Sequence, residues 1–186
     1  MRIIYSATND TDKQDLSPKD FLHALQEIPE GYRNIIQKEI FVVDYANPED
    51  AYWQKYYKDP TFKSYATGGN EITFYATKGR SMGYVKNSIC HEGAHYIDLY
   101  SPQKINISST NDWVNAMSQD RKDTGNDYPT SYAKLACQAN PGDNKEDFAE
   151  SVGLYLTDKE DFEIDFPNRT NIIVKELERN GWSQKN

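Results

Sequence analysis

The 186-residue sequence is 37% hydrophobic and 27% charged, which predicts a globular protein and argues against wholesale disorder. Its formal net charge is −8 and its basic residues form no stripe, so no nucleic acid partner is expected. No apolar run approaches the roughly 20 residues of a membrane-spanning helix, so no membrane insertion is expected. The length predicts one domain over 1–186, with an α/β lobe over 1–80 and a helical lobe over 81–186.

The first 80 residues predict short strands alternating with short helices. β-branched and aromatic residues favour strands in RIIYS (2–6) and KEIFVVDY (38–45). Between them, Ser17 and Pro18 predict a helix start, because serine caps helix N-termini and proline is favoured at the first helical position. Two further short helices are expected at 31–38 and 49–57. A strand is expected at 71–77, where the residues alternate between two different faces.

The second half of the chain predicts mainly helices. Four of them are expected, at 84–100, 111–121, 145–157 and 171–180, with a loop-rich stretch at 124–144. A small sheet followed by a helical half is the order of an α+β fold.

The stretch NSICHEGAHYID contains the pattern H-E-x-x-H at His91 to His95. Residues four apart lie one above the other on a helix, so both imidazoles can reach a single zinc ion. Glu92 lies beside them and can accept a proton as a general base. His91, His95 and Asp98 share one polar face of an otherwise apolar helix, and a buried polar face needs a partner such as a metal ion.

Catalytic zinc usually has three protein ligands, so a third ligand is expected elsewhere in the chain. NKEDFAESVGLYL predicts a helix with Glu146 and Glu150 on one face, where one carboxylate can bind the metal and the other can orient a ligand histidine. The remaining histidine, His23, lies beside Phe21 in an amphipathic helix, which favours a surface position.

The motifs HEGAHYID, SYA and EDFAES resemble those of the catalytic domains related to anthrax lethal factor, a group that includes the secreted Pro-Pro endopeptidases of clostridia. The resemblance covers residues 69–156. It implies a zincin fold of the gluzincin type, in which His91, His95 and Glu146 bind one zinc ion and Glu92 is the general base.

The resemblance also assigns supporting roles around the zinc ion. Glu150 would support a ligand histidine, and the tyrosine of SYA, Tyr132, would donate to the developing oxyanion. Tyr128, in NDYPTSYA, is the alternative donor. The family often has an acid at the position of Asp98, which could accept from a ligand histidine or anchor a loop.

The resemblance implies a zinc endopeptidase that cuts an extended protein or peptide segment, with proline-rich specificity as one option. The strand at 71–77 would be the sheet edge that pairs with the substrate. A secreted or toxin-like protease is expected. Because MRIIYSATND has no apolar signal-peptide core, a secreted protein would have lost its targeting segment. A cytoplasmic protein is the alternative. A non-catalytic binding module with the same fold is the alternative function, although the intact Glu92 argues against it.

Cys90 and Cys137 leave two alternatives open. They could be free, buried thiols, or they could form a disulfide that ties the segment before the glutamate helix to the histidine helix. The sequence does not indicate the oligomeric state.

Overall fold

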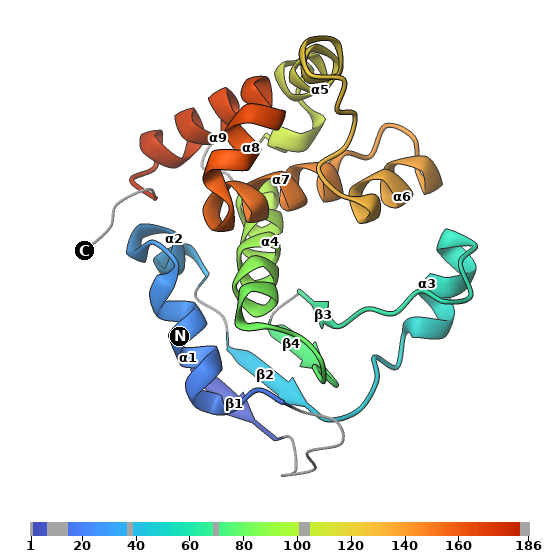
Figure 1. The fold of residues 1–186 in the computed structure, drawn as a ribbon, viewed down its shortest axis with the longest axis vertical. Helices are drawn as coiled ribbons and strands as arrows, with labels where there is room; N and C mark the ends of the chain where they lie inside the picture. Colours follow the sequence, from blue (N-terminus) through green and yellow to red (C-terminus); the bar gives the residue numbers. More distant parts are fainter. Residues whose placement is uncertain (1, 7–14, 37–38, 69–70, 101–104, 183–186) are drawn as a thin grey trace.

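The computed structural model describes residues 2–6, 15–36, 39–68, 71–100 and 105–182, in which a small sheet packs beneath a larger group of helices (Figure 1). The predicted α+β class is confirmed. The described strands form one mixed sheet in the order β1-β2-β4-β3, with β1, β2 and β4 parallel and β3 antiparallel to β4. Their bounds are β1 Ile3–Tyr5, β2 Ile40–Val43, β3 Ala66–Thr67 and β4 Ile72–Tyr75.

The prediction that the strand at 71–77 forms the sheet edge was wrong. β4 lies inside the sheet between β2 and β3, and its Ile72 and Phe74 are buried. The edge beside the histidine helix is β3, which the sequence analysis missed because a two-residue strand leaves no alternating pattern.

The described helices are α1 Pro18–Glu27, α2 Glu30–Ile35, α3 Asp50–Tyr57, α4 Met82–Tyr100, α5 Asn111–Asp123, α6 Ser131–Ala139, α7 Lys145–Thr157, α8 Lys159–Asp165 and α9 Pro167–Arg179, with a 3₁₀ turn, η1, at Ile107–Ser109. The loop predicted at 124–144 contains α6. Thr130 caps this helix by accepting from the amide of Ala133, and Ala133, Ala136 and Cys137 form its buried face. The predictions also missed α8 and placed the start of α9 four residues too late.

Local sequence signals explain why α1 forms and how it covers the sheet. The predicted cap is confirmed: the Asp20 carboxylate accepts from both the amide and the hydroxyl of Ser17, at 2.7 Å each. The buried ring of Phe21 then meets Phe74 of β4 edge-on, with ring centroids 5.2 Å apart.

Helix α4 runs through the middle of the molecule, between the sheet and the C-terminal helices (Figure 1). Its main helical partner is α7, and the two helices approach closely at Gly153. A β-carbon at that position would lie 3.1 Å from the side-chain nitrogen of Asn87 in α4. The glycine therefore lets the histidine helix and the glutamate helix pack side by side.

A buried ionic cluster fixes the first turn of α7. The fully buried guanidinium of Arg169, on α9, forms ion pairs of 3.0 Å with Asp120 of α5 and with Asp147 of α7. The indole of Trp113 donates to the same Asp147 carboxylate. Because Asp147 follows Glu146 directly, the cluster also fixes the backbone that carries Glu146.

Cys90 and Cys137 are both buried free thiols, so the structure has the first of the two arrangements that the sequence left open. Cys90 lies on the core side of α4, and its burial raises its thiol pKa to about 12. Among the described residues, no helix is long and apolar enough to cross a bilayer.

Candidate metal and active site

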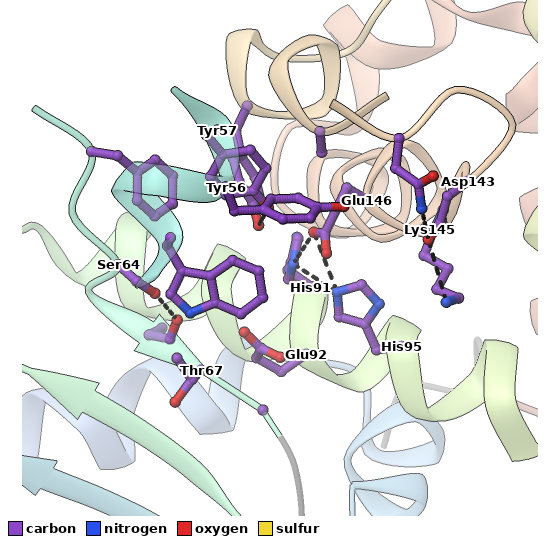
Figure 2. Close-up of a pocket in the computed structure, with 17 residues that line it drawn as sticks. Tyr56, Tyr57, Ser64, Thr67, His91, Glu92, His95, Asp143, Lys145 and Glu146 are labelled. Carbon is purple, nitrogen blue, oxygen red and sulfur yellow. Dashed lines mark hydrogen bonds and ion pairs between the residues drawn. The ribbon is translucent and has the colours of Figure 1, made fainter. Parts of the chain in front are cut away.

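Three side chains from two helices converge on one point, as Figure 2 shows. Nε2 of His91 and Nε2 of His95, one turn apart on α4, are 3.1 Å from each other. Oε2 of Glu146, in the first turn of α7, lies 3.2 Å from Nε2 of His91 and 3.4 Å from Nε2 of His95. The structure therefore brings together the two motif histidines and the first glutamate.

These spacings fit a single zinc ion. Ligand atoms at 2.0–2.1 Å from a tetrahedral zinc are about 3.3 to 3.4 Å from one another, which is close to the separations in this triangle. Oε2 of Glu146 is buried, and no described residue donates an aligned hydrogen bond to it, as expected of an oxygen that faces a cation. Two imidazoles and a carboxylate are a donor set that zinc accepts.

The charges around the triangle favour a cation there. Burial lowers the pKa of His91, but the adjacent Glu146 and Glu150 outweigh it, so this pKa stands well above its ordinary value. Burial raises the pKa of Glu146, but His91 and His95 outweigh it and hold this pKa well below its usual range. A divalent metal ion would supply the same positive charge.

The two predicted supporting acids lie in different places. Oε1 of Glu150, on α7, is 2.8 Å from Nδ1 of His91, a close ion-pair contact that is not aligned as a hydrogen bond. Asp98 accepts instead from the amide and the hydroxyl of Ser108, at 2.8 and 2.6 Å. Asp98 therefore anchors the η1 turn, which is the second of the two uses that the sequence left open.

His23 lies on α1 and pairs with Glu27, far from the triangle in sequence and on the exposed surface.

Glu92 projects beside the triangle and packs against the backbone at Gly68, directly after β3 (Figure 2). A β-carbon at residue 68 would lie 2.1 Å from Oε2 of Glu92, closer than any van der Waals contact allows. Glycine at this position therefore leaves the space that the Glu92 carboxylate occupies. The sequence alone did not single out Gly68, because this contact joins residues distant in the chain.

Tyr132 lies in the first turn of α6, over the triangle. Its ring centroid is 6.2 Å from that of His91, and its hydroxyl is 3.3 Å from the hydroxyl of Tyr57 on α3. Burial, followed by the nearby Glu146 charge, raises the pKa of Tyr132 far above its usual range, so its hydroxyl stays protonated and can donate. The lining of the cavity includes Tyr132 but not its alternative, Tyr128.

The triangle opens into a cavity of about 310 Å³ with one aromatic wall. That wall consists of Trp53, Tyr56 and Tyr57 from α3, together with Phe62 and Tyr132. Trp53 and Tyr57, one turn apart, stack with their ring centroids 5.8 Å apart. The sequence predicted this helix but not its place at the site; a concentration of five aromatics within 52–62 was the available signal.

The chain's similarity to known proteins lies in its fold. No family model matches the chain, and no curated protein matches it. Among solved structures it is similar to a Pro-Pro endopeptidase (PPEP-2) from Paenibacillus alvei, with a TM-score of 0.59 and 17% sequence identity, over 93% of this chain and 96% of that one. The two proteins share a fold. The likeness supports a fold of the Pro-Pro endopeptidase type and gives no specific support to the lethal-factor group.

Proposed function

We propose that this protein is a zinc-dependent endopeptidase of the gluzincin type, related to the lethal-factor group. The observation that carries the proposal is the triangle of His91, His95 and Glu146 with Glu92 beside it in an open cavity. A zinc ion held by the three ligands would act as a Lewis acid toward water and the scissile carbonyl.

The chain's own residues divide the remaining tasks. Glu92 takes a proton from the attacking water and delivers it to the leaving amine. The Tyr132 hydroxyl donates a hydrogen bond to the oxyanion that develops on the carbonyl oxygen. Glu150 holds the ring of His91 through its contact with Nδ1.

The substrate in this proposal is an extended peptide segment. Among the described strands β3 pairs only with β4, and it lies beside Glu92, so its other edge can add a peptide strand. The aromatic wall of α3 offers flat apolar surface, which suits proline rings and so supports a proline-rich preference. Secretion is part of the proposal and rests on the resemblance alone.

A non-catalytic binding module is the alternative function. It would retain the fold and could retain the metal, but it has no use for a carboxylate placed beside the ligands. The Gly68 backbone, which leaves space for the Glu92 carboxylate, favours the enzyme.

The test is incubation of the purified protein with a peptide library that includes proline-rich segments, with cut sites read by mass spectrometry. Cleavage within peptides that stops with a chelator and returns with added zinc is the expected result. Intact peptides under all zinc conditions would favour the binding module.

Gly68→Ala is expected to lower kcat by roughly 10², because the added methyl displaces the Glu92 carboxylate by about 1 Å and catalytic geometry tolerates little displacement. Zinc content should stay at the wild-type level. Gly83→Ala is the matched control, since a β-carbon there meets nothing closer than Oγ of Ser81 at 3.6 Å. Equal kcat values for the two variants, measured on one cleaved peptide, would show that Gly68 does not position Glu92.

A further inference from the structure

Beside the candidate site lies a second cavity, of about 560 Å³, whose wall includes the side chain of Arg80. The two cavities share six lining residues, so they are neighbouring parts of one cleft: Phe62, Ser64, Ala66, His91, Glu92 and Tyr132. Arg80 lies in the turn between β4 and α4, at the N-terminal end of the histidine helix.

Two aromatic rings fix the guanidinium of Arg80. Its central carbon lies 3.8 Å from the ring centroid of Tyr65 and 5.1 Å from that of Tyr84, both of which line the same cavity. Its Nε atom is buried, and no described residue forms a hydrogen bond with it. The part of the chain that the structure describes gives Arg80 no ion pair with a carboxylate. The guanidinium is therefore held in place by two aromatic rings, and none of the described residues pairs a carboxylate with it.

The acids that line the same cavity already have other contacts. Glu150 lies 2.8 Å from Nδ1 of His91, and Glu92 packs against Gly68. A guanidinium presents a planar fork of donors that matches a carboxylate, and the positive end of the α4 dipole adds to the attraction. The ligand chemistry that fits Arg80 is therefore a carboxylate brought in by the substrate.

The strand direction indicates which side of the scissile bond would reach Arg80. β3 runs from the Tyr65 end toward Gly68 and Glu92. A peptide that pairs antiparallel with β3 would place its C-terminal side toward Tyr65, and hence toward Arg80. Tyr84 precedes His91 by seven helical positions, or about 10 Å along the axis, which about three extended residues span.

We propose that Arg80 is a specificity-determining residue that binds a substrate carboxylate two to four positions after the scissile bond. The carboxylate can come from an acidic side chain or from the C-terminus of a short substrate. This inference rests on the proposed peptidase function.

The experiment compares kcat/KM for matched peptides built on one cleaved sequence. Glutamate and glutamine are exchanged at each of the second, third and fourth positions after the bond, and truncated peptides end in a free acid or an amide. The wild-type enzyme should favour the carboxylate form by about 10- to 100-fold at one of these positions, as expected of a charge-assisted hydrogen bond. A preference for glutamate at an internal position assigns Arg80 an acidic side chain as its ligand. A preference for the free acid that is confined to truncated peptides assigns it the C-terminal carboxylate.

Variants then assign the preference to Arg80. In Arg80→Gln the ratio of kcat/KM for the glutamate peptide to that for the glutamine peptide should fall to about one. Arg80→Lys should keep part of the preference, because lysine retains the positive charge but lacks the planar fork of donors. Lys63→Gln is the matched control, since it removes an exposed charge from the same cavity wall and should keep the wild-type ratio.

The outcomes separate the two proposals. Peptide cleavage by the wild-type enzyme with no carboxylate preference at any of these positions would overturn the role of Arg80 and leave the peptidase in place. A preference that persists in Arg80→Gln, or that disappears in Lys63→Gln alone, would also overturn it. If no peptide in the library is cut, the peptidase proposal fails, and the Arg80 proposal fails with it.

Discussion

Replacing Glu92 with glutamine is expected to lower kcat by about 10² to 10⁴, the usual contribution of a general acid–base group. Glutamine has nearly the same size, so it keeps the contact with Gly68 but cannot accept the proton. Fold and zinc content should not change, because Glu92 is not one of the three proposed zinc ligands. Steady-state kinetics on a cleaved peptide, with metal analysis of the same preparation, measure both.

Glu160→Gln is the control for this variant, because it removes the same charge from an exposed position on α8. It should behave as the wild type. Turnover by Glu92→Gln within a few-fold of the wild type would contradict the assigned base, even with full zinc content.

Replacing Tyr132 with phenylalanine is expected to lower kcat by about 10² to 10³ while KM changes little. The hydroxyl would donate to the oxyanion only as charge develops, so its loss affects the transition state more than substrate binding. The ring still packs against Tyr57 and Phe62, so the fold should survive. Separate measurement of kcat and KM distinguishes this effect from a general loss of packing, which would alter both.

Tyr128→Phe is the matched control, because this was the alternative donor in the sequence. The structure leaves it out of the cavity lining, so its kinetics should match the wild type. If the loss appears in Tyr128→Phe and not in Tyr132→Phe, the oxyanion donor has been assigned to the wrong tyrosine.

The side chains of the triangle were predictable because their spacing along each helix is local. His91 and His95 are one helical turn apart, and so are Glu146 and Glu150. Gly153 indicates that the glutamate helix can pack closely against a neighbouring helix. The motif resemblance then selected Glu146 as the third zinc ligand, and its Oε2 lies within 3.4 Å of both histidines, which supports that proposal.

Other features depend on contacts between distant segments and leave little trace in the sequence. The segment around α6 contains many turn-forming residues, so the sequence favoured a loop, but the Thr130 cap and the packing of the helix against α7 make it helical. Likewise, the contact between Gly68 and Glu92 and the position of Arg80 beside the cleft arise only when the sheet meets α4.

The central claim is one zinc ion bound by His91, His95 and Glu146, and metal analysis of purified protein tests it most directly. The wild type should contain about one zinc per chain, and His95→Ala should lose most of it, since one of the three ligands is gone. His23→Ala, which removes an exposed histidine paired with Glu27, is the control and should keep its zinc. Full zinc retention in His95→Ala, or a wild-type protein that binds no zinc when it is supplied, would contradict the account.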